Sequence, residues 1–143
     1  MKIALIYATK HNHTKKVIDN IKVSFMFDVF NVKNLVESSI IDYDIYLWFC
    51  PTYGDAELPL DMEDFINTLT LKHKKFIICE LGNYYGYDDY QFGSLKIIQN
   101  NLTALGWCEA MGGLSLDSLP KIDWSSYYLW CERLDEYVRK CCT

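Results

Sequence analysis

The segment TKHNHT, residues 9–14, joins an apolar stretch to the first amphipathic stretch and carries residue types that bind anions. Thr9 and Thr14 have hydroxyl groups that can donate hydrogen bonds, and Lys10 adds a positive charge. Free backbone N–H groups at the start of a helix favour a negatively charged ligand. Asn12 can adopt the left-handed backbone conformation better than most residues with a side chain. Two interpretations stay open from these residues: a phosphate-binding loop without glycine, or an ordinary polar turn.

The same segment contains two histidines, His11 and His13, which raises the question of a metal site. Side chains two residues apart diverge both in a helix and in a strand, so these two imidazoles would not converge on one ion. The sequence offers no obvious third ligand nearby. We therefore predict no metal site and expect both histidines at the surface.

A second segment with possible chemistry is CPTYGDAELPLDMEDF, residues 50–65. Tyr53 offers a flat, partly polar ring on which a planar ligand can stack. Gly54 can change its backbone conformation at little steric cost. Asp55 and Glu57 place negative charge beside that ring. The alternative is a turn followed by a solvated helix start, where acidic residues are common.

The third segment, LGNYYGYDDYQFG at residues 81–93, is rich in tyrosine and glycine and contains two aspartates. Aromatic rings in a glycine-bearing loop favour a planar ligand or a partner surface. The alternative is that some rings simply cover the core. We favour that alternative for Tyr90 and Phe92, which adjoin the following helical stretch.

Five short apolar stretches predict strands, and the stretches between them predict helices. The first, third and fourth are almost continuously apolar, which favours strands covered on both faces. The predicted strands span residues 3–8, 26–32, 45–50, 76–81 and 110–116. Helical spacing marks four helices, at Val17, Ile18 and Ile21; Met62, Phe65, Ile66 and Leu69; Leu95, Ile98, Leu102 and Leu105; and Tyr127, Cys131, Leu134 and Val138. A further short helix is predicted within residues 33–39.

This alternation predicts an α/β fold, a three-layer sandwich with a five-stranded parallel sheet and right-handed crossovers. No repeat or linker interrupts the sequence, so we expect one domain over residues 1–143. Ligands of such folds bind beyond the carboxyl ends of the strands, near the point where the strand order reverses. The three segments above follow the first, third and fourth predicted strands, so they are expected to meet at one edge of the sheet.

Composition narrows the function. The 143 residues carry a net charge of -5, which disfavours nucleic acids and anionic membranes as main partners. The first apolar stretch resembles a buried strand more than a signal peptide, and no stretch approaches the roughly 20 apolar residues of a membrane span. We expect a cytoplasmic protein. Its six cysteines are spaced irregularly, so reduced thiols are predicted, and no pair is spaced like zinc ligands.

Taken together, the three segments resemble the loops of the flavodoxins, and the resemblance covers essentially the whole chain. Residues 9–14 occupy the place of the family's phosphate loop, with His11 where a hydroxyl residue is usual and Asn12 where glycine is usual. The chain resembles the short-chain type, because residues 110–116 run on to the last helix without an inserted loop. The cofactor-binding residues that the resemblance implies are Thr9, Lys10, His11, Asn12, His13, Thr14, Pro51, Thr52, Tyr53, Gly54, Asp55, Leu81, Gly82, Asn83 and Tyr87.

The resemblance implies a bound flavin mononucleotide (FMN) and one-electron transfer between a reductase and acceptor proteins. Tyr53 and Tyr87 would then stack on the two faces of the flavin ring. The Gly54–Asp55 peptide would flip so that its carbonyl accepts a hydrogen bond from the flavin. We expect an electron carrier rather than an enzyme with its own substrate, a monomer, and redox partners with basic docking surfaces.

Three other functions of the same fold remain open at this point. A flavodoxin-like quinone reductase would use a nicotinamide to reduce quinones. A flavodoxin-like activator of manganese ribonucleotide reductase would use FMN to make an oxidant for that enzyme. The unusual residues 9–14 also leave room for a binding module of flavodoxin fold that has lost FMN.

Overall fold

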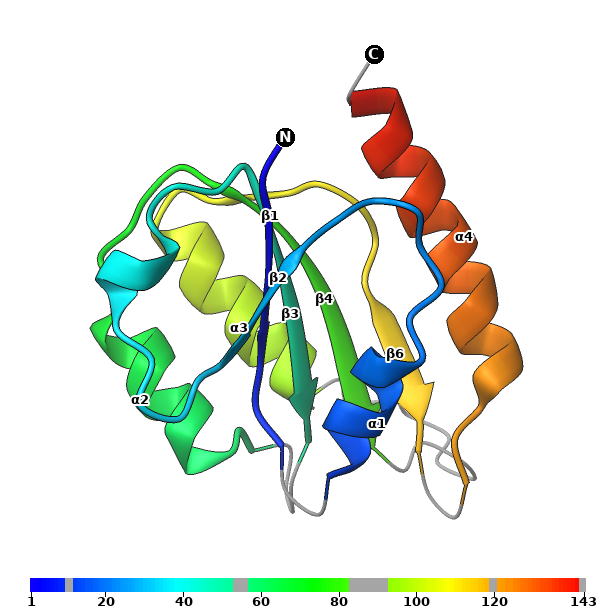
Figure 1. Cartoon of the computed structure of the whole chain (residues 1–143). Helices are drawn as coiled ribbons and strands as arrows, with labels where there is room; N and C mark the ends of the chain where they lie inside the picture. Colours follow the sequence, from blue (N-terminus) through cyan, green and yellow to red (C-terminus); the bar gives the residue numbers. More distant parts are fainter. Residues whose placement is uncertain (10–11, 53–56, 83–92, 119–120, 142–143) are drawn as a thin grey trace.

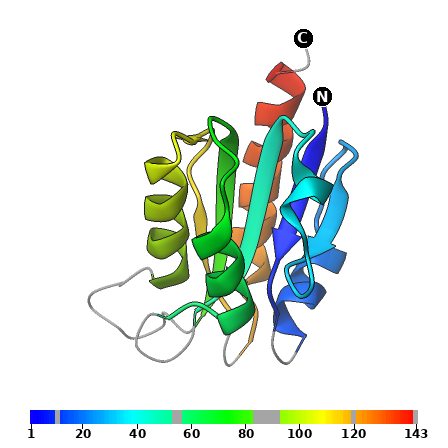
Figure 2. The same cartoon turned by 90° about the vertical axis from the view of Figure 1, so that its left-hand side faces the viewer.

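In the computed structural model, parallel strands form one sheet that helices cover on both faces (Figures 1 and 2). The structure describes residues 1–9, 12–52, 57–82, 93–118 and 121–141. In these residues the strand order is β2-β1-β3-β4-β5, and β6 also pairs with β4. The strands are β1 Ile3–Tyr7, β2 Asp28–Asn31, β3 Ile45–Pro51, β4 Lys75–Gly82, β5 Cys108–Glu109 and β6 Leu114–Asp117. The predicted α/β fold with a parallel sheet is confirmed.

The central strands are buried on both faces, as their continuous apolar sequences predicted. Every residue of β1 and β3 is buried. Successive side chains point to opposite faces, so the two faces of the sheet carry separate hydrophobic cores. Trp48 of β3 belongs to one core, and its neighbours Leu47 and Phe49 belong to the other.

Each core is completed by two helices. The core around Trp48 includes Met62 from α2 and Ile98 from α3. The opposite core includes Val17 from α1 and Leu134 from α4, and Figure 1 shows these two pairs of helices on opposite sides of the sheet. The helices are α1 His13–Asp19, α2 Leu60–Thr68, α3 Gly93–Ala104 and α4 Trp124–Cys141. The four predicted apolar faces are confirmed, although the helices end before Ile21, Leu69 and Leu105.

Two predicted elements need correction. The short helix expected within residues 33–39 is a 3-10 helix, η1 Glu37–Ile40. The strand expected over residues 110–116 is two short strands, β5 and β6, on the same side of β4.

The break between β5 and β6 has a geometric reason. Phe76 pairs with Glu109 and Cys79 pairs with Leu114, so residues 77–78 of β4 lie opposite residues 110–113. The longer segment cannot stay in the ladder and bulges out of it.

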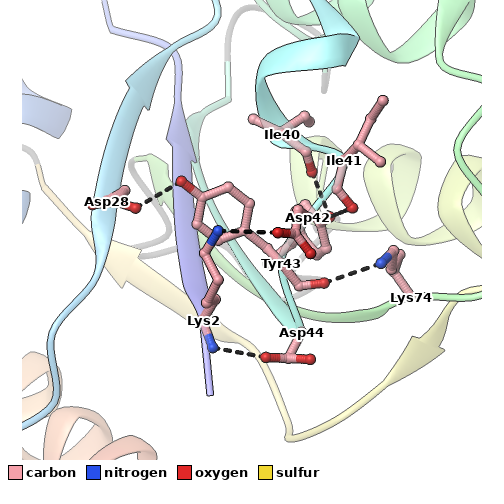
Figure 3. Close-up of polar contacts among 9 residues, drawn as sticks. Lys2, Asp28, Ile40, Ile41, Asp42, Tyr43, Asp44 and Lys74 are labelled. Carbon is pink, nitrogen blue, oxygen red and sulfur yellow. Dashed lines mark hydrogen bonds and ion pairs between the residues drawn. The ribbon is translucent and has the colours of Figure 1, made fainter.

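Polar contacts join the strands at the amino edge of the sheet (Figure 3). The backbone N–H of Lys2, just before β1, donates to Asp44, just before β3, over 2.7 Å. The Tyr43 hydroxyl donates to Asp28 of β2 over 2.6 Å. That hydrogen bond, with some burial, raises the pKa of Tyr43 to about 12. These contacts fix β1, β2 and β3 relative to one another at the edge away from the three predicted loops.

The cysteines of the described chain are free thiols. Cys50, Cys79 and Cys131 are buried, and Cys108 and Cys141 are exposed. Burial raises the pKa of the Cys50 thiol, so this group stays protonated and inert at neutral pH. Cys142 lies outside the described residues. No described helix is both long and apolar enough to cross a membrane.

Candidate functional site

The carboxyl ends of the central strands meet at one edge of the sheet, the lower edge in Figure 1. Tyr7 at the end of β1 pairs with Phe49, and Pro51 at the end of β3 pairs with Leu81. Gly82 at the end of β4 pairs with Asp117 of β6. The structure therefore brings the eight described residues of the predicted site to a common edge. They are Thr9, Asn12, His13, Thr14, Pro51, Thr52, Leu81 and Gly82.

The first loop turns at Asn12. Its backbone has φ 61° and ψ 12°, the left-handed conformation that asparagine adopts better than most residues with a side chain. The carbonyl of Asn12 accepts a hydrogen bond from the Lys16 N–H over 3.1 Å, and α1 begins at His13. Asparagine thus makes here the turn that glycine makes most easily.

Two hydroxyl groups on either side of this turn are buried without a partner. The Oγ1 atoms of Thr9 and Thr14 are inaccessible to solvent, and neither has a hydrogen-bond partner in the described part of the protein. Thr14 as a whole is 0% exposed. A buried polar group left unpaired costs about 1–3 kcal/mol, so such groups usually serve a purpose. Both hydroxyls can donate to an oxyanion bound at the loop.

The lysines near the loop are not equivalent. Lys15 donates a hydrogen bond to Asp19 one turn further along α1, and this bond raises the pKa of Lys15. Its charge is therefore partly balanced within the helix. Lys16 is exposed and has no ion pair in the described residues. His13 is half-buried, and the described residues contain no cluster of three His, Cys, Asp or Glu side chains that could hold a metal ion.

The chain leaves β3 and β4 as two adjacent segments. The Thr52 N–H donates to the Leu81 carbonyl over 2.7 Å, and the Ser118 N–H donates to the Gly82 carbonyl over 2.9 Å. Pro51 and Leu81 are buried. The second and third loops therefore start side by side.

A residue that sequence reasoning missed, Glu80 of β4, lies beneath these two segments. It is 0% exposed, and its carboxylate accepts hydrogen bonds from Thr52 over 3.1 Å and from Ser115 over 2.7 Å. The Leu95 N–H at the start of α3 donates to the same carboxylate over 3.2 Å. The sequence did contain a signal, because Glu80 is the one charged residue in the apolar run FIICEL. Glutamate is almost never fully buried unless it is paired.

Seven predicted site residues lie outside the described residues, so their roles stay predictions. They are Lys10, His11, Tyr53, Gly54, Asp55, Asn83 and Tyr87.

The geometry of this edge can be compared with known proteins. No family model matches the chain. A curated flavodoxin from Synechococcus elongatus is 27% identical over 112 residues, which span 73% of this chain and 66% of that protein. Oxidised flavodoxin 2 from Bacillus cereus superposes with a TM-score of 0.78 at 22% identity, covering 98% of this chain and 99% of that one. The fold is that of the flavodoxins.

A flavodoxin that binds FMN has the same architecture. The Fusobacterium nucleatum flavodoxin, whose structure holds flavin mononucleotide, matches with a TM-score of 0.74 at 18% identity, over 98% of this chain and 96% of that one. The resemblance inferred from the three loops is confirmed in sequence and in fold. The chain spans slightly less than two thirds of the length of the Synechococcus elongatus flavodoxin.

Proposed function

We propose that the protein binds FMN at the carboxyl edge of its sheet and carries single electrons between a reductase and acceptor proteins. The observation that supports this most strongly is the pair of buried, unpartnered hydroxyls of Thr9 and Thr14 around the left-handed turn at Asn12. The similarity to flavodoxins in sequence and in fold supports the same proposal. The cofactor and the electron-carrier role are proposals for this chain.

The first loop would hold the phosphate of FMN. The hydroxyls of Thr9 and Thr14 would each donate a hydrogen bond to a phosphate oxygen, and hydrogen bonds to a charged acceptor are the stronger kind. Free backbone N–H groups at the start of α1 add a favourable field for an anion. Lys10, His11 and His13 complete the loop in sequence, and Lys10 would add a positive charge.

The second and third loops would hold the flavin ring. Tyr53 and Tyr87 would cover its two faces, and Pro51, Thr52, Leu81, Gly82 and Asn83 would line its edge. The carbonyl of the Gly54–Asp55 peptide would accept a hydrogen bond from the ring, and glycine makes the required change of conformation cheap. Bound FMN supplies the one-electron chemistry, while the protein sets its potential and excludes water.

Negative charge near this edge would tune the flavin and select partners. Glu57 and the α2 residues Asp61, Glu63 and Asp64 are exposed. They oppose the build-up of negative charge on the reduced flavin, although salt screens exposed carboxylates. The same charges would steer partner proteins that have basic docking surfaces. Association with such a partner should slow as salt is added.

We also propose that the protein acts as a cytoplasmic monomer of one domain.

The test is stepwise anaerobic reduction of the FMN-loaded protein, followed by its visible spectrum. We expect stoichiometric FMN uptake and two one-electron steps at separate potentials. A protein that stays colourless would contradict the proposal and favour the binding module. Rapid NADPH oxidation with a quinone would favour a quinone reductase instead. A flavin that takes up two electrons in one step would favour the ribonucleotide reductase activator.

A further inference from the structure

Glu80 accepts hydrogen bonds from three separate parts of the chain. Its Oε1 accepts from the Thr52 hydroxyl over 3.1 Å, from the Leu95 N–H over 3.2 Å and from the Ser94 hydroxyl over 3.4 Å. Its Oε2 accepts from the Ser115 hydroxyl of β6 over 2.7 Å. Glu80 and Ser94 are both 0% exposed, so water does not compete for these groups.

The partners of Oε1 border the two aromatic loops. Thr52 directly precedes residues 53–56, and Ser94 follows residues 83–92 after Gly93. The two borders also contact each other, because the Ser94 N–H donates to the Thr52 Oγ1 over 3.2 Å. The Thr52 and Ser94 hydroxyl oxygens lie 2.9 Å apart. One buried carboxylate is therefore shared by the start of the second loop and the end of the third.

The carboxylate also lies at the beginning of α3. The first N–H groups of a helix have no partner within the helix, and Leu95 is the third residue of α3. A negative group is favoured at this end of a helix. Removal of the acceptor would end its hydrogen bonds with the Leu95 N–H and the Thr52 hydroxyl, which are both partly buried, and this costs more than the loss of an exposed hydrogen bond.

We propose that Glu80 is a positioning residue that holds Thr52 and Ser94, the borders of the second and third loops, next to each other and thereby supports FMN binding. This inference rests on the proposed FMN site. A binding site needs supporting hydrogen bonds that lock its first layer of residues, and an arrangement that is slightly too loose loses affinity. The carboxylate acts through Thr52 and through Ser94 and Leu95.

Two substitutions separate the hydrogen bonds from the shape of the side chain. Glu80→Leu keeps a side chain of similar size and removes both acceptor oxygens. Glu80→Gln keeps one acceptor oxygen for Thr52 and Leu95, and its amide can donate to the Ser115 hydroxyl. Ser115→Ala is the matched control, because it removes a hydrogen bond to the same carboxylate from β6, away from both loop borders.

The experiment measures FMN affinity by titration and the amide exchange of Thr52, Ser94 and Leu95 by NMR in the FMN-free protein. For Glu80→Leu we expect FMN binding about tenfold weaker and exchange at Leu95 about tenfold faster. We expect Glu80→Gln and Ser115→Ala to remain within about threefold of the wild type in both measurements. Rescue by glutamine distinguishes positioning by hydrogen bonds from an effect of charge.

Several results would overturn the proposal. One is a Glu80→Leu protein that binds FMN like the wild type, even if its exchange is faster. Another is a Glu80→Gln protein as impaired as Glu80→Leu. If Glu80→Leu does not fold, Ser94→Ala replaces it, and unchanged FMN affinity in that variant would count against the proposal. If the wild type binds no FMN, the proposed function fails, and the exchange rates alone decide whether Glu80 joins the two borders.

Discussion

At the scale of single residues, Asn12 carries the turn on which the first loop depends. Its φ of 61° is unfavourable for most residues with a Cβ atom and easy for glycine. We expect Asn12→Ala to have a free energy of unfolding about 1 kcal/mol lower than that of Asn12→Gly. Denaturant unfolding of the two variants measures the difference. Equal stabilities would contradict the left-handed turn.

Thr14 gives a prediction in which stability and binding change in opposite directions. Its hydroxyl is buried and unpartnered, so Thr14→Val removes an unsatisfied polar group and keeps the shape. We expect the FMN-free variant to be at least as stable as the wild type, by up to about 1 kcal/mol, and to bind FMN about tenfold more weakly. Thr103→Val, at an exposed position of α3, is the control that should change neither quantity. A Thr14→Val protein that loses stability without losing affinity would show that the hydroxyl serves the fold.

The backbone conformation of Asn12 could be anticipated from the sequence, whereas the environment of Glu80 could not. The left-handed turn at Asn12 follows from one residue type at the end of a strand, and no distant contact is needed to predict it. The partners of Glu80 are spread from Thr52 to Ser115, so its environment depends on the assembled sheet. The sequence could flag Glu80 as a charge in an apolar strand, but it could not name its partners.

At the scale of elements, the interrupted edge of the sheet depends on close packing at Gly113. A Cβ atom there would lie 2.6 Å from the Ile78 carbonyl oxygen and 2.9 Å from Leu95 Cδ1. At the adjacent Gly112, a Cβ atom would meet nothing within 4 Å. We expect Gly113→Ala to lower the free energy of unfolding by about 1–3 kcal/mol. Gly112→Ala should change it by no more than about 0.5 kcal/mol. Denaturant unfolding of the two variants measures the difference. Equal effects would contradict the close approach of Gly113 to Ile78 and Leu95.

The elements themselves were largely predictable, because strands buried on both faces leave a nearly continuous apolar run. β1, β3 and β4 follow that rule, and their predicted and observed bounds differ by one residue at each end or less. The division into β5 and β6 was not predictable, since it arises from the unequal lengths of residues 77–78 and 110–113. The register between two strands depends on both of them, so it could not be predicted from the sequence of one strand alone.

At the scale of the whole molecule, the two edges of the sheet differ in whether their polar groups have hydrogen-bond partners. The amino edge has contacts that pair its groups, such as Tyr43 with Asp28 and Lys2 with Asp44. The carboxyl edge keeps the Thr9 and Thr14 hydroxyls buried without partners in the described chain. A third buried polar atom without a partner in the described chain, Trp48 Nε1, lies in the core instead. A ligand at the carboxyl edge would explain the two threonine hydroxyls.

The most direct test of this account is a calorimetric titration of the FMN-free protein with FMN and, separately, with riboflavin, which lacks the phosphate. Because the Thr9 and Thr14 hydroxyls are assigned to the phosphate, we predict that FMN binds at least about 100-fold more tightly than riboflavin. Thr14→Val should reduce this ratio of affinities, because it should weaken the binding of FMN and leave the binding of riboflavin unchanged. Equal affinity for the two flavins, or no binding of either, would contradict a phosphate site at this loop.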